Sequence, residues 1–226
     1  MLFPQLSARV ADVRARIDAA VERGGHGQNV TIVAVTKTHG PEAVRAASAQ
    51  GISDIGENRV QEAIAKMKDV EEPVRWHLIG HLQRNKVKSL DSFSLFHALD
   101  SMRLAEAIDR LGTERQMPFD VLVQVNPARE ETKGGFDMHE IDAAAKNLSA
   151  MSGLRVRGAM TVARLNADER ELRETFGAVR GTCSILAQAG HPATELSMGM
   201  SNDFEIAVEE GATMVRLGSV LFGARA

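Results

Sequence analysis

The chain contains no tyrosine and only one cysteine, Cys183, among its 226 residues. One cysteine cannot form a disulfide within the chain, which fits a reducing compartment. No stretch of about 18 consecutive apolar residues is present, so the sequence predicts no transmembrane helix. The N-terminal residues lack the basic and apolar regions of a signal peptide, and we therefore expect a cytoplasmic location.

Neither sign of charge dominates the sequence. Lysine and arginine number 27 and the acidic residues 30, which gives a formal net charge of −3. Proteins that bind nucleic acids or anionic membranes usually carry an excess of basic residues, so we expect neither partner. The hydrophobic share of 44% and the charged share of 25% are typical of a folded soluble domain and exclude a disordered or collagen-like chain.

Short apolar segments alternate with longer amphipathic ones. The expected strands are residues 30–35, 52–56, 76–79, 95–99, 121–125, 156–162, 195–198 and 214–217. The expected helices are residues 41–50, 59–69, 82–90, 101–111, 138–150, 168–189 and 203–210, with an extra helix at about 5–22. Glycines at positions where helix C-caps belong are Gly51, Gly112, Gly190 and Gly211.

This alternation predicts an α/β fold in which helical crossovers make all strands parallel. Eight such units in 226 residues fit a compact (β/α)8 TIM barrel, and an open doubly wound sheet is the alternative. We expect a single domain over residues 1–226, with an N-terminal helix and linker at 1–28 and the barrel at 29–226. Polar residues follow the expected strands, where barrels carry their reactive groups, and this favours the barrel.

Lys37 closes the first expected strand. Its aliphatic stem would lie in the core and its amine at the barrel mouth, where removal from water favours the neutral form. A neutral amine is what a Schiff-base nucleophile requires. The alternative is a lysine that reaches solvent or pairs with a carboxylate.

A possible phosphate site follows the last two strands. Arg216 lies in the eighth strand, and Gly218 and Ser219 open the turn after it. Glycine permits close approach of a ligand to the backbone, and free N–H groups at such a turn bind phosphate. The loop after the seventh strand, residues 196–204, adds two hydroxyl groups and a glycine. Ordinary turn and cap chemistry is the alternative interpretation.

Two weaker patterns carry less information. His77 and His81 span a strand-to-loop turn, and no carboxylate or cysteine completes a ligand set with them and His39, so we expect no metal. The segment 130–135 is either a solvated loop or, through Lys133 and its paired glycines, part of a lid.

Six sequence blocks, in order along the chain, resemble the YggS/PROSC group of pyridoxal-phosphate homeostasis proteins. They are AVTKTHG (34–40), IGENRVQEA (55–63), WHLIGHLQRNK (76–86), EETKGG (130–135), RGAMTV (157–162) and LSMGMSNDFEIAVEEGATMVRLGSVLFGAR (196–225). The last block is the most specific, because many adjacent positions match. His81 stands where other members often have proline.

The resemblance implies a barrel of the alanine racemase N-terminal type that binds pyridoxal 5'-phosphate (PLP). It implies that Lys37 holds PLP as an internal aldimine and that Arg216 faces the pyridine nitrogen. It further implies phosphate contacts from Ser201, Gly218 and Ser219, and a place near the ring for Asn58. The implied role is PLP (vitamin B6) and amino-acid homeostasis without catalytic turnover, with PLP-dependent apoenzymes as possible recipients.

Catalysis is nevertheless an alternative. Arg216 cannot accept a proton, and its charge disfavours a protonated pyridine ring, so the bound cofactor would be a weak electron sink. A racemase of this type needs a tyrosine as its second base, and the chain has none. A weak racemase or lyase, and a Schiff-base aldolase without PLP, are the alternatives. We expect a monomer or weak dimer, since no tyrosine must be borrowed across an interface.

Overall fold

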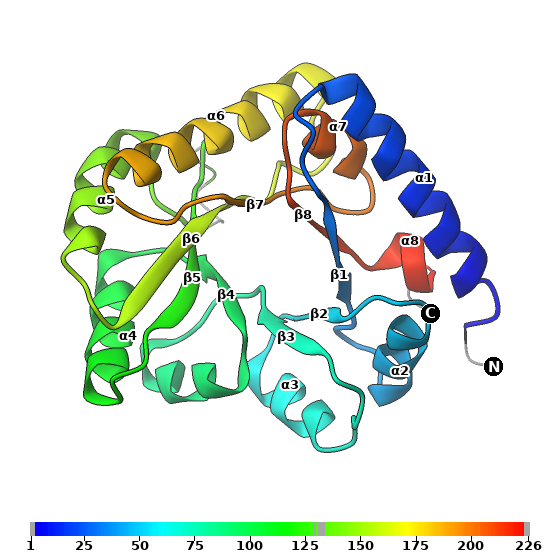
Figure 1. The fold of residues 1–226 in the computed structure, drawn as a ribbon, viewed down its shortest axis with the longest axis horizontal. Coiled ribbons are helices and arrows are strands. Elements are labelled where there is room, and N and C mark those ends of the chain that lie inside the picture. The colour runs from blue at the N-terminus through cyan, green and yellow to red at the C-terminus, as the bar shows by residue number, and fades with distance from the viewer. Residues whose placement is uncertain (1–2, 129, 131–133, 224–226) are drawn as a thin grey trace.

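Eight parallel strands form a closed barrel that is surrounded by helices (Figure 1). The computed structural model describes residues 3–128, 130 and 134–223. The strands are β1 (Thr31–Val35), β2 (Asp54–Glu57), β3 (Arg75–Leu78), β4 (Leu95–Leu99), β5 (Phe119–Gln124), β6 (Leu154–Met160), β7 (Glu195–Ser197) and β8 (Met214–Leu217). β1 pairs with β8 from Thr31 opposite Met214 to Ala34 opposite Leu217. This pairing closes the sheet, confirms the predicted barrel and rules out the open doubly wound sheet.

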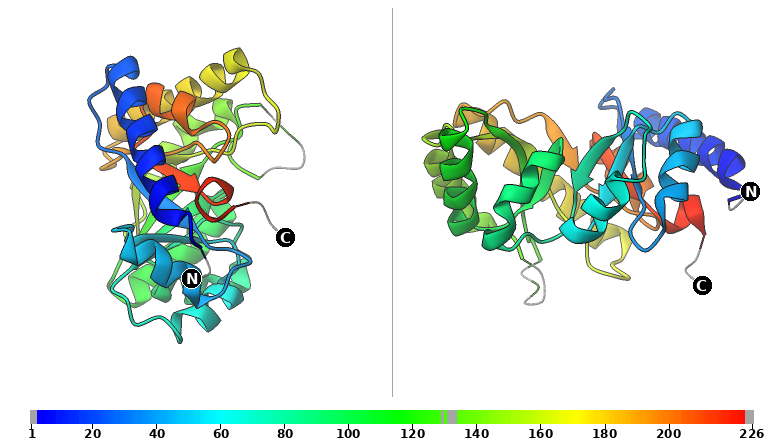
Figure 2. Two further views of the ribbon diagram at one scale, coloured as in Figure 1. Left: turned by 90° about the vertical axis from the view of Figure 1, so that its right-hand side faces the viewer. Right: turned by 90° about the horizontal axis from the view of Figure 1, so that it is seen from below.

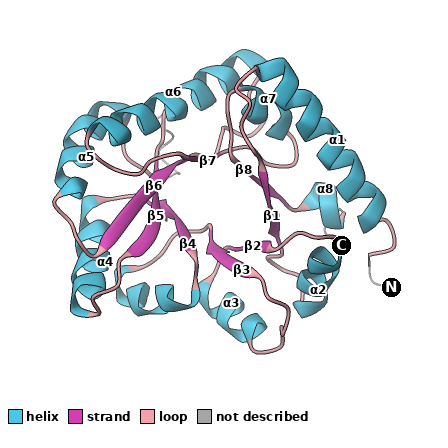
Figure 3. Ribbon diagram, in the orientation of Figure 1, coloured by secondary structure: helices cyan, strands magenta, loops and turns pink. Residues whose placement is uncertain are grey.

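Helices lie between consecutive strands in the chain and cover the outside of the barrel, as the alternation of apolar and amphipathic segments predicts (Figure 3). They are α1 (Leu6–Gly24), α2 (Pro41–Ala49), α3 (Val60–Met67), η1 (Arg84–Ser92), α4 (Met102–Glu114), η2 (Met138–Glu140), α5 (Ile141–Ser149), α6 (Glu169–Gln188), α7 (Phe204–Glu209) and α8 (Ser219–Phe222). Pro41 begins α2, where its missing N–H costs no hydrogen bond. Asp168 caps α6 by accepting a hydrogen bond from the N–H of Glu171.

The structure differs from the sequence prediction at three places. The segment after β3 is a 3-10 helix, η1, whose buried side chains Val87 and Leu90 are three residues apart and therefore share one face. Gly112 does not end a helix, because α4 continues to Glu114. A Cβ atom at Gly112 would lie 1.9 Å from the carbonyl oxygen of Gly153, so this glycine lets α4 pack closely on the loop between α5 and β6. The short helix α8 was not predicted.

Helix α1 packs across α7 and α8 at the outer edge of the barrel, as Figure 1 shows. Its apolar face buries Val10, Val13 and Ile17. Ion pairs hold its polar flank, with Arg16 and Glu205 2.6 Å apart at their closest atoms. The predicted N-terminal helix is thus anchored to the last elements of the chain.

The loops that follow the strands meet at one end of the barrel. In the side view of Figure 2 (right), the loop after β6 and helix α8 lie at this same end. Among the described residues, no helix combines the length and the hydropathy needed to cross a bilayer.

Candidate functional site

A cavity of about 800 Å³ opens at the carboxyl ends of the strands. All six residues singled out from the sequence line it, namely Lys37, Asn58, Ser201, Arg216, Gly218 and Ser219. They come from the ends of β1, β2, β7 and β8 and lie up to 182 positions apart in the chain, since 219 − 37 = 182. Closure of the barrel between β8 and β1 is what brings the lysine and the glycine turn to one cavity.

Lys37 lies two residues after the end of β1, and its side chain is half-buried in the cavity wall. The next residue, Thr38, has a φ of +72°, which is unusual for a β-branched side chain. Its N–H donates to a carboxylate oxygen of Glu62 in α3, at 2.7 Å. A strained residue held by a specific hydrogen bond fixes the direction in which the chain leaves Lys37.

A buried polar cluster supports β1 behind Lys37. The ammonium of Lys66 lies 2.5 Å from a carboxylate oxygen of Glu57 and donates to the carbonyl oxygen of Thr36 at 2.8 Å. The hydroxyl of Thr36 donates to the same Glu57 oxygen at 2.5 Å. Burial raises the pKa of Glu57, although the hydrogen bonds from Lys66 and Thr36 oppose this rise. The cluster therefore ties the residue before Lys37 to both β2 and α3.

Arg216 lies at the floor of the cavity with 4% of its surface exposed. One terminal nitrogen donates to the carbonyl oxygen and the hydroxyl of Ser197, at 2.7 and 2.6 Å. The other donates to the carbonyl oxygen of Thr161 at 2.7 Å. Burial lowers the pKa of Arg216 to about 10, partly opposed by the charge of Asp203. The guanidinium thus stays positively charged at neutral pH in a fixed orientation.

The turn after β8 leads into α8, whose first residue is Ser219. The first N–H groups of a helix have no partner within it. Ser201, from the loop after β7, accepts a hydrogen bond from the N–H of Val220 at 3.2 Å. Gly218 and Ser219 line the cavity beside Ser201, and backbone N–H groups with hydroxyls in this arrangement suit an oxyanion.

Asn58 also lines the cavity and comes directly after β2. The loop after β3 packs on its backbone at Gly80, where a Cβ atom would lie 2.2 Å from the carbonyl oxygen of Asn58. Glycine at this position lets the two loops touch and holds Asn58 at the cavity.

Sequence reasoning missed several residues that also line the cavity. The polar ones are His39, Arg164 and Asn166, and the exposed apolar one is Leu165. They lie further along the loops than the first residues after each strand. Loop residues show no periodic alternation of apolar and polar side chains that would predict where they lie. Met200, Asn202 and Asp203 also line the cavity, and they belong to the loop 196–204 that the sequence had marked as a phosphate site. Glu130 belongs to the segment 130–135, for which the sequence left open a solvated loop or part of a lid, whereas Lys133 lies outside the described residues.

Two of the histidines considered as metal ligands, His77 and His81, lie in different parts of the molecule. His77 is buried inside the barrel, and His81 pairs with Asp100 on the surface, with ring nitrogen and carboxylate oxygen 2.8 Å apart. Within the described ranges, no three side chains of the metal-binding types are grouped as a ligand set.

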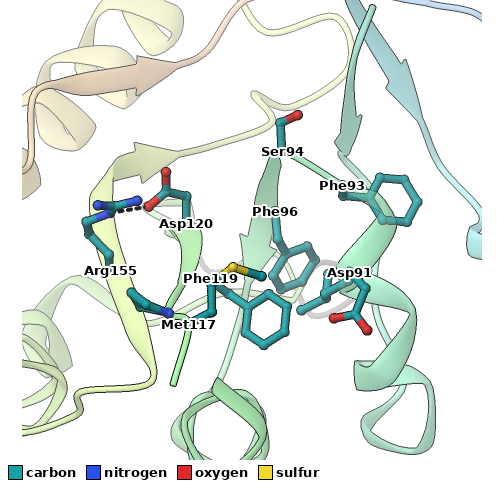
Figure 4. Close-up of a pocket in the computed structure, with 10 residues that line it drawn as sticks. Asp91, Phe93, Ser94, Phe96, Met117, Phe119, Asp120 and Arg155 are labelled. Carbon is teal, nitrogen blue, oxygen red and sulfur yellow. Dashed lines mark hydrogen bonds and ion pairs between the residues drawn. The ribbon is translucent and has the colours of Figure 1, made fainter. Parts of the chain in front are cut away.

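A smaller cavity of about 210 Å³ lies near the amino ends of β4, β5 and β6 (Figure 4). Its lining is largely apolar, with Phe96, Met117 and Phe119 around it, and Arg155 pairs with Asp120 at its edge. None of the six residues singled out from the sequence lies there, so the larger cavity is the candidate site.

Comparison with known proteins identifies the family of this chain. The family model for the alanine racemase N-terminal domain matches residues 9–226. The pyridoxal phosphate homeostasis protein of Aquifex aeolicus is 39% identical over 223 residues, which span 96% of this chain and 97% of the relative. That of Escherichia coli K12 is 34% identical over 229 residues, which span 97% of each chain.

A solved structure has the same fold. PipY of Synechococcus elongatus, determined with PLP bound, is 36% identical and superimposes with a TM-score of 0.84 over 97% of this chain and 100% of its own. The match to the family model and to these relatives over almost the full length shows that the chain belongs to the alanine racemase N-terminal domain family, within the group of pyridoxal phosphate homeostasis proteins.

Proposed function

We propose that this chain binds pyridoxal 5'-phosphate in the cavity, linked to Lys37 as a Schiff base, and serves PLP and amino-acid homeostasis without catalytic turnover. The observation that carries the proposal is the meeting of an amine, a buried guanidinium and a glycine turn at one cavity. The names of the relatives and the PLP-bound structure of PipY support it.

The donor groups of the cavity fit this cofactor. Among the described residues, three of the five N–H groups of Arg216 are engaged by Ser197 and Thr161, which leaves donors for a pyridine nitrogen. Ser201, Gly218 and Ser219 offer hydroxyls and N–H groups to a phosphate. Lys37 supplies the amine, and Asn58 lies on the wall beside the space for the ring.

When bound, PLP supplies an aldehyde that condenses with amines and a ring that withdraws electrons. Lys37 would supply the amine that condenses with this aldehyde, and the aldehyde oxygen would leave as water with the two protons of the amine. Arg216 donates a hydrogen bond to the ring nitrogen but, as a cation, disfavours a proton there. The residues of this chain therefore favour holding the cofactor over activating it.

The covalent site can be tested by trapping. After PLP is added, borohydride reduction of the imine followed by peptide mass mapping is expected to place the pyridoxyl group on Lys37. Lys37→Ala should keep its fold, because the phosphate contacts do not need the amine, and should take up no label. Lys146→Ala is the matched control, because it removes an exposed lysine that does not line the cavity. Label on other lysines in the wild-type protein would refute the assigned site.

The lack of turnover is a separate prediction. We expect the PLP-loaded protein to leave alanine and other small amino acids unchanged in chiral chromatography, because Arg216 weakens the electron sink. The matched control is a free PLP solution, which gives the background rate. Racemisation or elimination above that rate, lost in Lys37→Ala, would favour the weak racemase or lyase. PLP-dependent apoenzymes as recipients, and a monomer or weak dimer, complete the proposal.

A further inference from the structure

A column of polar side chains crosses the interior of the barrel. Asp54 of β2, His77 of β3, His97 of β4 and Ser197 of β7 are all buried. A ring nitrogen of His77 lies 2.9 Å from a carboxylate oxygen of Asp54, and its other nitrogen lies 2.8 Å from His97. The second nitrogen of His97 lies 2.8 Å from the hydroxyl of Ser197. Barrel interiors are usually filled by branched apolar side chains, so this column calls for an explanation.

The two ends of the column lie at opposite ends of the barrel. At the upper end, Ser197 accepts a hydrogen bond from Arg216 on the floor of the candidate site. At the lower end, Asp54 accepts from Arg75 at 2.7 Å and lines a cavity of about 360 Å³ near Thr31 and Ser53. The column therefore connects the candidate site to the amino end of the barrel.

With Asp54 ionised, as its hydrogen bonds from Arg75 and His77 favour, only one arrangement of protons uses every contact without adding a buried charge. Arg216 donates to the Ser197 hydroxyl, so the hydroxyl proton is free to donate to Nδ1 of His97. A neutral His97 then carries its proton on Nε2 and donates to Nδ1 of His77. His77 in turn carries its proton on Nε2 and donates to Asp54. Every hydrogen bond points from the arginine towards the carboxylate.

The opposite direction is less favourable. If Nδ1 of His97 donated to Ser197, then His77 would have to donate to His97 from Nδ1. His77 could still donate to Asp54 only as a doubly protonated cation, which places another charge in the interior. The serine proton would also lose the acceptor that His97 provides.

We propose that Ser197, His97, His77 and Asp54 are positioning residues that form a one-directional hydrogen-bond relay and hold Arg216 in its orientation towards the cofactor ring. The inference rests on the proposed function, because the ring nitrogen is what Arg216 is positioned for. The carbonyl oxygens that hold Arg216 carry no net charge, whereas the relay links it to the carboxylate of Asp54. Polarised hydrogen bonds in series strengthen one another, which fixes the guanidinium at the cavity floor.

The relay itself can be tested without cofactor. Long-range proton–nitrogen NMR of the free protein at pH 7 is expected to show His77 and His97 neutral, each with its proton on Nε2. In Ser197→Ala, the nitrogen resonances of both histidines should shift, although only His97 contacts the altered residue. A doubly protonated His77, a proton on Nδ1 of either ring, or a shift confined to His97 would overturn the relay.

The effect of the relay on PLP binding is a second readout. Ser197→Ala should weaken PLP binding about fivefold, the equivalent of one hydrogen bond, and shift the absorbance maximum of bound PLP. Thr182→Val is the matched control, because it removes a buried hydroxyl on α6 whose one hydrogen bond among the described residues is to the carbonyl oxygen of Ala178. If both variants behave like wild type towards PLP, the positioning role is refuted while the proposed function stands. Failure of wild-type protein to label on Lys37 would refute the proposed function, and the NMR result would still judge the relay.

Discussion

Replacing Lys66 with methionine is expected to lower the free energy of unfolding by about 3–5 kcal/mol at pH 7. Lys66 and Glu57 form an ion pair whose side chains are 4% and 0% exposed. Removing the ammonium leaves a buried carboxylate whose pKa is already raised by burial. Within the described part of the chain, the Thr36 hydroxyl is then its one remaining side-chain donor. Uncompensated buried charge is among the most costly defects a core can carry.

The measurement is urea unfolding of the two proteins, and two further variants make it specific. Lys68→Met removes an exposed lysine two positions away. It should lower the free energy of unfolding by less than about 0.5 kcal/mol, as surface substitutions generally do. The double change Lys66→Met with Glu57→Leu should recover most of the loss, because neither charge is then buried alone. A small loss in Lys66→Met, or no recovery in the double variant, would show that the pair is not the support inferred here.

The same variant bears on the candidate site. Lys66 donates to the carbonyl oxygen of Thr36, the residue before Lys37, and Glu62 holds the N–H of Thr38 on the other side. The lysine proposed to carry the cofactor is thus fixed by hydrogen bonds on both flanks. The stability of the fold and the placement of Lys37 depend on one cluster.

Much of the architecture follows from the sequence because a parallel barrel repeats one pattern. Alternation of apolar and amphipathic segments predicted every strand, and the ends of those strands led to Lys37 and Arg216. Gly112 shows where local rules fail. Glycine near an expected helix end indicates a cap, yet here the contact with Gly153, 41 positions later (153 − 112 = 41), decides its role. Contacts between distant segments cannot be inferred from local propensity.

The contacts of the buried polar side chains could not be predicted from the sequence. His77 was weighed as a metal ligand with His81, but alternation along a strand sends His77 into the barrel while His81 lies in the loop beyond. Strand periodicity could have placed His77 and His97 in the interior. It could not have shown that they meet, because that depends on the register between β3 and β4. The cavity likewise collects loop residues such as Arg164 and Asn166 that no pattern marks.

Acid is expected to remove a defined part of the stability through Asp54. Burial alone would raise the pKa of Asp54, but hydrogen bonds from His77 and Arg75 outweigh it and lower the pKa from 3.8 to about 2. A carboxyl group whose pKa is lower in the folded than in the unfolded state stabilises the fold when ionised. The contribution, about 2 kcal/mol, is therefore complete above pH 4 and is lost as the pH falls through about 2.

The difference in unfolding free energy between wild type and Asp54→Asn isolates this contribution. We expect wild type to be more stable by about 2 kcal/mol at pH 6, and the difference to shrink between pH 4 and pH 2, as followed by urea unfolding. Asp18→Asn is the matched control, since Asp18 lines the same lower cavity but is exposed. A difference that stays constant or grows in acid would contradict an ionised Asp54 at the end of the relay. Because asparagine can still accept the hydrogen bond of His77, the loss reports the negative charge of Asp54 beside His77 and Arg75 rather than the shape of the column.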